Sequence, residues 1–252
     1  MTTILITNDD GINAPGIWAL RDALEGLGDL WIVAPDRERS GVSHAFTLNT
    51  PLRVEHHPRH GLENCYSVTG TPVDSAKIAL RRLMPEPPSL VVSGINRGEN
   101  GGVNILYSGT VAGAMEGALV GIPSIAFSIG WGDKIDYKPA GHYARLIAEK
   151  VISEKLPAGA LLNVNVPNLP LDKIKGIRIT EMADSHYEEN IDGRIDPRGR
   201  AYYWIAGGLK IVGDGVGTDL NAIQDGFVSI TPLRAQLTDD ALLTTLTGWN
   251  LE

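Results

Sequence analysis

The first 34 residues alternate between short apolar runs and a helical repeat of apolar positions. Residues 3–6 and 30–34 are apolar runs of strand length, whereas Ile17, Leu20, Leu24 and Leu27 recur at the spacing of one helix face. Strands that are apolar at every position are typical of a parallel sheet covered by helices on both faces. The pattern therefore predicts a β-α-β unit and an α/β fold.

The same kind of pattern continues to residue 166 and then changes. Strands are predicted at 52–55, 66–69, 90–92, 124–128 and 161–166, and helices at 73–83, before 121 and at 139–154. Beyond residue 166, stretches near 176–181, 201–206 and 226–230 alternate like strands with no helix between them, 184–200 is polar and charged, and a last helix is expected at 238–246. We expect a core at residues 1–166 and a strand-rich extension at residues 167–252, within one domain.

Composition narrows the class of protein. The 252 residues are 43% hydrophobic with a formal net charge of −8, which fits a globular core and disfavours a stable complex with nucleic acid. The single cysteine, Cys65, excludes an internal disulfide and a thiolate zinc cluster, and fits a reducing compartment. The chain enters a strand directly and has no run of about 18 apolar residues. We therefore expect a cytoplasmic protein without membrane contact.

Two adjacent acidic residues, Asp9 and Asp10, follow the first strand in the sequence TNDDG at 7–11. Ligand sites of α/β sheets form at this carboxyl edge. Two carboxylates repel a phosphate unless a cation lies between them, and hard divalent cations prefer oxygen ligands. This predicts a metal site. The alternative is that Asp9 caps the next helix while Asp10 and Gly11 form a turn.

Two further stretches are expected at the same edge of the sheet. Residues 35–44 offer Ser40 as an oxygen ligand and either His44 or the arginines of this stretch toward the substrate, with a solvated loop as the alternative. The glycine- and asparagine-rich stretch 93–104 follows the strand at 90–92 and offers the amide oxygen of Asn96 to a hard cation.

The sequence YSGTV at 107–111 opens a helix of small residues. The hydroxyls of Ser108 and Thr110, with the bare backbone at Gly109, predict an anion site at the start of this helix. An ordinary helix cap would explain only one of the two hydroxyls.

These motifs together resemble those of the SurE family, the stationary-phase survival proteins that act as 5′-nucleotidases. The resemblance rests on TNDDG at 7–11, APDR at 34–37 with RSG at 39–41, GTP at 70–72, SGINRG at 93–98, YSGTV at 107–111, GTD at 217–219 and VSITPL at 228–233. It implies a Rossmann-like three-layer core with a mostly parallel sheet. It also implies one divalent cation per subunit, such as Mg²⁺ or Mn²⁺, on Asp9, Asp10, Ser40 and Asn96. Finally, it implies a homo-dimer or tetramer in which a C-terminal extension exchanges between subunits.

The favoured function is a metal-dependent phosphomonoesterase that hydrolyses nucleoside 5′-monophosphates to nucleoside and phosphate, with Asp9 and Asp10 as catalytic carboxylates. Ser108, Gly109 and Thr110 would bind phosphate, and Asn8 and His44 are candidate substrate contacts. One alternative is a nucleotide-binding regulatory module without turnover. Another is an aspartyl-phosphate phosphatase, although its acids are usually separated by one residue. Base selectivity is expected to be modest unless 35–44 or 184–200 supply aromatic stacking, and neither is rich in aromatic residues.

Overall fold

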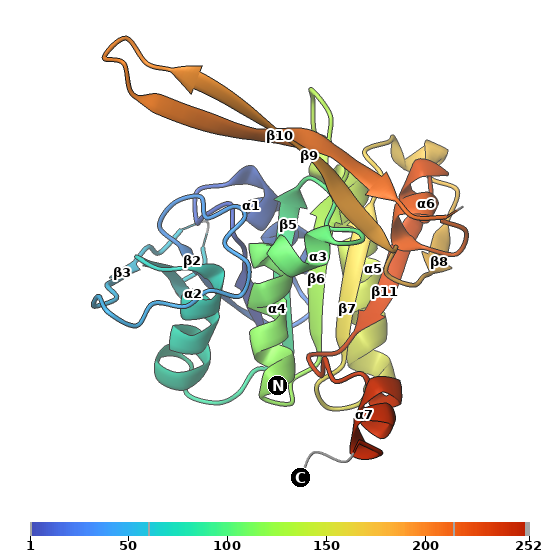
Figure 1. The fold of residues 1–252 in the computed structure, drawn as a ribbon. Coiled ribbons are helices and arrows are strands. Elements are labelled where there is room, and N and C mark those ends of the chain that lie inside the picture. Colours follow the sequence, from blue (N-terminus) through green and yellow to red (C-terminus); the bar gives the residue numbers. More distant parts are fainter. Residues whose placement is uncertain (1, 60, 214, 250–252) are drawn as a thin grey trace.

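The computed structural model describes residues 2–59, 61–213 and 215–249. Residues 1, 60, 214 and 250–252, which belong to the predicted core and the predicted extension, lie outside the described residues. A nine-stranded sheet forms its centre, in the order β3-β4-β2-β1-β5-β6-β7-β11-β8 (Figure 1). Its strands are β1 Thr3–Thr7, β2 Asp29–Pro35, β3 Val54–His56, β4 Cys65–Val68, β5 Leu90–Arg97, β6 Ser124–Ile129, β7 Leu161–Val166, β8 Ile177–Ile179 and β11 Val228–Leu233.

The sheet is built outward in two directions from β1. The chain first adds β2 and β4 on one side of β1, then returns to place β5 on the other side and continues to β6 and β7, all in parallel pairing. Strand β3 runs antiparallel to β4, and β11 runs antiparallel to β7 while pairing in parallel with β8. The order therefore reverses between β1 and β5, and ligands of open α/β sheets bind at the carboxyl ends of strands at such a point.

Helices cover both faces of the sheet. Helices α1 and α5 pack side by side on one face, and α2 and α4 pack side by side on the other (Figure 1). This three-layer arrangement confirms the predicted α/β fold. The helices are α1 Pro15–Leu24, α2 Pro72–Ile78 with a π-helical continuation Ala79–Leu83, α3 Asn104–Tyr107, α4 Gly109–Leu119, α5 Tyr137–Glu154, α6 Asp219–Gln224 and α7 Asp240–Thr247, with a 3₁₀ turn at Leu171–Lys173.

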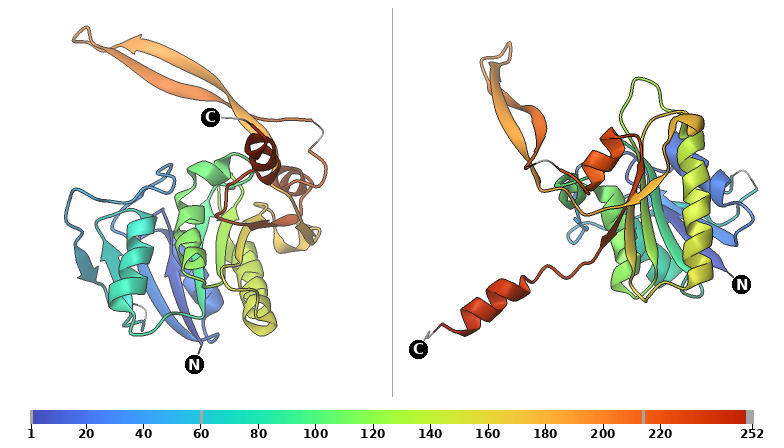
Figure 2. Two further views of the ribbon diagram at one scale, coloured as in Figure 1. Left: turned by 60° about the horizontal axis from the view of Figure 1, so that its bottom comes forward. Right: turned by 90° about the vertical axis from the view of Figure 1, so that its right-hand side faces the viewer.

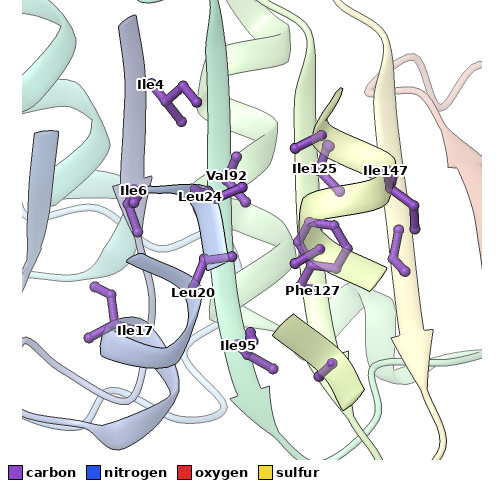
Figure 3. Close-up of a cluster of buried hydrophobic side chains, with 14 of the residues drawn as sticks. Ile4, Ile6, Ile17, Leu20, Leu24, Val92, Ile95, Ile125, Phe127 and Ile147 are labelled. Carbon is purple, nitrogen blue, oxygen red and sulfur yellow. The ribbon is translucent and has the colours of Figure 1, made fainter. Parts of the chain in front are cut away.

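Alternate side chains of the central strands enter two different cores. Ile4 and Ile6 of β1 pack with Leu20 of α1 and Ile147 of α5 (Figure 3), whereas Leu5 belongs to a separate cluster on the opposite face. All five side chains are buried. This explains why the strands are apolar at every position rather than at every second one.

Two C-terminal elements lie away from the layered core. Strands β9 Ser185–Ile195 and β10 Ala201–Ile211 form a long antiparallel hairpin that projects past the carboxyl edge of the sheet (Figure 1). Helix α7 has no buried residue and lies at the end of an extended segment (Figure 2). No helix in the described part of the chain has the length and apolar character needed to cross a membrane.

The C-terminal third differs from the sequence analysis in one stretch that was given no element and in one prediction that was wrong. Polar residues 184–200 contain the whole of strand β9, because its hydrogen-bonded ladder with β10 satisfies the backbone without needing a buried apolar face. Helix α6 occurs between β10 and β11, where no helix was expected; Thr218 caps it by accepting a hydrogen bond from Asn221 N. Strands β8 and β11 continue the main sheet past residue 166, and the division of the chain at that residue stays a prediction.

Candidate active site

An open cavity of about 710 Å³ lies at the carboxyl edge of the sheet, beside the point where the strand order reverses. The structure brings five of the predicted site residues into its lining: Asp9, Asp10, Ser40, Asn96 and Ser108. The remaining lining residues are Glu38, Gly41, Arg97, Gly98, Glu99, Asn100, Asn104, Tyr107, Trp131, Tyr187, Glu189, Ile205, Ala206 and Gly207.

The turn after β1 is shaped by Asn8. Its side-chain amide donates to Gly11 O at 3.0 Å, and its Oδ1 accepts from Gly11 N at 3.1 Å. Gly11 has a φ of +95°, and a β-carbon there would lie 2.8 Å from the carbonyl carbon of Arg37. Asn8 is fully buried and does not line the cavity, so both ends of its amide hold the turn that presents the two acids.

Asp9 is a buried carboxylate held by the start of α4. The Thr110 hydroxyl donates to Asp9 Oδ1, and the backbone of Asp9 accepts from Arg39 N at 2.7 Å. A β-carbon on Gly109 would lie 2.9 Å from the β-carbon of Asp9, so the close approach of α4 needs glycine. The pKa of Asp9 is raised to about 6, because burial and the charge of Asp10, which raise it, outweigh the hydrogen bonds from Thr110, which lower it.

Asp10 is more accessible and lies beside Arg97. Arg97 N donates to Asp10 Oδ2 at 3.4 Å. Burial raises the pKa of Asp10, and the nearby charge of Glu38 adds to this, while the backbone hydrogen bond and the charge of Arg97 oppose it. Both adjacent acids therefore ionise less readily than usual in the protein alone, which is the electrostatic condition that a bound cation relieves.

Ser40 and Asn96 bring uncharged oxygen atoms to the same cavity. Ser40 is exposed on the loop after β2, and its hydroxyl donates to Glu38 Oε1 at 2.8 Å. The register of β5 against β6 shifts between Ser93 and Asn96, a type of irregularity that re-aims side chains near active sites. The amide nitrogen of Asn96 donates to Gly98 O at 2.8 Å, so its Oδ1 is the atom that could bind a cation.

The predicted phosphate site is divided between the cavity and the interior. Ser108 lines the cavity and caps α4, its hydroxyl accepting from Val111 N at 3.1 Å. Gly109 and Thr110 are buried and are not among the lining residues, and the Thr110 hydroxyl is engaged with Asp9. The structure thus gives Thr110 a contact with the acidic pair instead of an exposed position.

His44 lies outside the lining of the cavity. Its Nε2 is 2.6 Å from Oε1 of Glu116, a buried residue of α4 whose other oxygen is 2.7 Å from Lys77 Nζ. Burial alone would raise the pKa of Glu116, but the hydrogen bonds from His44 and Lys77 outweigh it and leave the pKa below its usual value. His44 therefore ties the loop that carries Ser40 to α4.

Several lining residues were not predicted. Arg97 and Glu99 lie inside the stretch 93–104, so their positions within a ligand-binding motif could have indicated them. Trp131, Tyr187, Glu189 and residues 205–207 come from the loop after β6 and from the hairpin, which no motif marks.

The charge of the cavity is unbalanced. Among the described residues, Arg97 is the one basic side chain of the lining, and the acidic side chains are Asp9, Asp10, Glu38, Glu99 and Glu189. Within residues 2–59, 61–213 and 215–249, no three His, Cys, Asp or Glu side chains are grouped to hold a metal ion. A hard cation at this edge would thus use uncharged oxygens beside the two adjacent carboxylates.

Comparisons with known proteins find one family whose sequences and fold are similar to this chain. A family model described as "Survival protein SurE" matches residues 4–189. A protein named 5′-nucleotidase SurE from Heliobacterium modesticaldum is 46% identical over 98% of this chain and 91% of its own length, and one of the same name from Symbiobacterium thermophilum is 47% identical over 100% and 99%. A crystal structure of the SurE protein from Aquifex aeolicus superposes with a TM-score of 0.86 at 42% identity, covering 97% of this chain and 98% of that one.

Proposed function

Because this chain belongs to the SurE family, we propose that it is a metal-dependent phosphomonoesterase, a 5′-nucleotidase that releases phosphate from nucleoside 5′-monophosphates. Its relatives from Heliobacterium modesticaldum and Symbiobacterium thermophilum are named 5′-nucleotidases, which supports an enzyme with a nucleotide substrate. The proposal goes further in assigning one divalent cation per subunit to Asp9, Asp10, Ser40 and Asn96.

The charge of the cavity is the observation that supports the metal assignment. A phosphomonoester carries up to two negative charges, and the lining offers it five acidic side chains against Arg97. Such a substrate would be repelled without added positive charge. A divalent cation on the two aspartates and the two uncharged oxygens would supply that charge and lower the pKa of a bound water.

The protein's own groups hold and orient the reactants. Thr110 fixes one oxygen of Asp9, so the other oxygen keeps a defined direction. Ser108 lies where the cavity meets the start of α4, and a helix N-terminus attracts phosphate oxygens. Arg97, beside Asp10, is placed to pair with an anionic substrate at the same edge.

Phosphate release with and without metal tests this function. We expect turnover of nucleoside 5′-monophosphates with Mn²⁺ or Mg²⁺, loss of turnover in EDTA, and recovery when the cation is restored. Diesters should react poorly, because an internal phosphate has two free oxygens instead of three for the cation and Ser108 to share. An undiminished rate in EDTA would contradict the metal assignment.

An assay separates this proposal from a regulatory module, and the burial of Asp9 separates it from an aspartyl-phosphate phosphatase. A regulatory module would bind a nucleotide without releasing phosphate, so the same assay excludes one or the other. An aspartyl-phosphate phosphatase needs an accessible nucleophilic carboxylate. Asp9 is buried and its Oδ1 is hydrogen-bonded to Thr110, which disfavours it in that role. Trapping a phosphorylated Asp10 by rapid acid quench and mass spectrometry would support the covalent route instead.

We also propose that the chain assembles at least as a homo-dimer through its C-terminal extension. The hairpin exposes Ile191, Ile205 and Trp204, and α7 exposes Leu242 and Leu243. Exposed apolar side chains grouped in this way are typical of an interface. Light scattering at micromolar concentration should give a mass above the 27.1 kDa of one chain. A monomer would refute the assembly but leave the reaction untouched.

We also propose a cytoplasmic location, which is supported by the one cysteine, Cys65, being buried and without a disulfide, as suits a reducing compartment. Fractionation of the source cells, followed by immunoblotting, tests this location.

A further inference from the structure

A tryptophan faces the cavity from a loop that no motif marks. Trp131 follows β6, lines the same cavity as Asp10 and Ser108, and leaves 66% of its surface exposed. An indole is among the largest apolar surfaces that a side chain offers, and leaving it in water forgoes the gain from its burial. A ligand that covers the ring would recover that gain.

The ring is held in place although it is exposed. A β-carbon on Gly98 would lie 2.6 Å from Cε2 and Nε1 of the indole, so this contact requires glycine, which has a φ of +111°. The guanidinium carbon of Arg97 is 5.7 Å from the ring centroid, and Trp131 N donates to Glu99 Oε2 at 3.1 Å. The segment 97–99 therefore supports Trp131 as a preorganised surface.

The same segment joins the indole to the metal-binding side of the cavity. Asn96 donates to the carbonyl of Gly98, the residue on which the indole rests. Arg97 contacts Asp10 through its backbone and the indole through its side chain. A ligand with an anionic end at Asp10 and a flat end on Trp131 would thus bind two adjoining parts of one cavity.

We propose that Trp131 is the surface on which the nucleobase of the substrate stacks, an inference that rests on the proposed nucleotidase function. Every base has an aromatic face, and a purine covers more of an indole than a pyrimidine does. The protein should therefore prefer purine 5′-monophosphates. The aromatic group comes from the loop after β6 and not from residues 35–44. Tyr187 of the stretch 184–200 also lines the cavity, and its hydroxyl donates to Asn104 Oδ1 at 2.6 Å.

Steady-state kinetics with three substrates test this assignment. We would compare AMP, CMP and ribose 5-phosphate, which has the phosphate and sugar without a base, in wild type, Trp131→Ala and Trp131→Phe. Trp249→Ala is a matched control, since Trp249 is 58% exposed and does not line the cavity. Base stacking of the usual strength corresponds to about 5- to 150-fold in affinity.

We expect Trp131→Ala to raise KM for AMP within that range with little change in kcat. The ratio of kcat/KM for AMP over ribose 5-phosphate should collapse, as should the preference for AMP over CMP. Trp131→Phe should restore most of both ratios, and Trp249→Ala should keep the wild-type ratios. A purely structural role for Trp131 would lower turnover of all three substrates together.

The failure of this inference is distinguishable from failure of the proposed function. If wild type releases phosphate from none of the three substrates, the nucleotidase function is wrong. If wild type turns over AMP and Trp131→Ala keeps the wild-type ratio of AMP to ribose 5-phosphate, the stacking assignment is overturned. Equal losses on AMP and ribose 5-phosphate would overturn it as well.

Discussion

Replacing Asp9 by asparagine is expected to stabilise the metal-free protein while it removes activity. The carboxylate of Asp9 is buried, hydrogen-bonded to Thr110 and adjacent to Asp10, and its pKa is about 6 in place of the usual 3.8. The difference between these two values corresponds to about 3 kcal/mol against the ionised form. Asparagine keeps an oxygen that can accept from Thr110 but carries no charge.

The sign of the pH dependence follows from the raised pKa. Below pH 3.8 Asp9 is protonated in both folded and unfolded protein and has no effect on the free energy of unfolding. As the pH rises from there to about 6, the unfolded chain ionises first, so wild type loses stability. Above that pH the loss is complete, at about 3 kcal/mol. The Asp9→Asn variant has no such dependence.

Thermal unfolding of EDTA-treated protein measures this gap. At pH 8 the Asp9→Asn variant should melt about 6–12 °C above wild type, given ~2–4 °C per kcal/mol for a chain of this size. At pH 4 most of this gap should be gone. Asp10→Asn should act in the same direction with a smaller effect, since Asp10 is less buried. Added Mn²⁺ should raise the melting temperature of wild type and leave Asp9→Asn unchanged.

Three results would each refute part of this reasoning. A gap of equal size at pH 4 and pH 8 would mean that the substitution acts through packing and not through charge. A variant less stable than wild type at pH 8 in EDTA would mean that the ionised carboxylate is favourable in the fold. Equal affinity of wild type and Asp9→Asn for Mn²⁺ by calorimetry would remove Asp9 from the metal site.

Gly109→Ala should lower kcat/KM on the order of 100-fold, because the new methyl group would lie 2.9 Å from the β-carbon of Asp9 and displace it. Unchanged kinetics with an unchanged circular dichroism spectrum would contradict the close approach of α4. Glu116→Gln should lower the free energy of unfolding at pH 7 by about 1–3 kcal/mol, because the buried carboxylate that accepts from His44 and Lys77 is lost. Since the pKa of Glu116 lies below its usual value, its stabilisation is present above that value and is lost as the pH falls. Urea unfolding at pH 7 and pH 3.5 should show the gap narrowing, and a gap that widens at low pH would contradict the ion pair.

Periodicity was sufficient for the elements that bury an apolar surface. Strands β1 and β2 and helix α1 could be predicted because their burial repeats along the chain, at every position in the strands and on one face in the helix. Strand β9 could not, because a two-stranded ribbon exposed on both faces imposes no such repeat. Helix α6 is only six residues long, too short for a helical period to be visible.

Site residues could be predicted where they directly follow a strand. They could not be predicted where their position depends on a contact with a residue far away in the sequence. Asp9, Asp10 and Asn96 lie in or directly after strands, so sheet topology alone brings them to one edge. The position of His44 depends on Glu116 of α4, and that of Trp131 on its contact with Gly98, neither of which any local pattern reveals. The hydroxyl of Thr110 was predicted to bind an anion, but in the structure it donates a hydrogen bond to Asp9 Oδ1.

The strands at the two outer edges of the main sheet are short, and this protects the molecule from unwanted strand pairing. Strands β3 and β8 stand at these edges and are only three residues long. Short edge strands give another chain little backbone on which to add a strand. The hairpin has the opposite property, since β9 and β10 are each eleven residues long and their outer edges pair with no other described strand. Aggregation of the protein during concentration or refolding should therefore begin at the hairpin, and a proline placed at an outward-facing amide of β10 should suppress it.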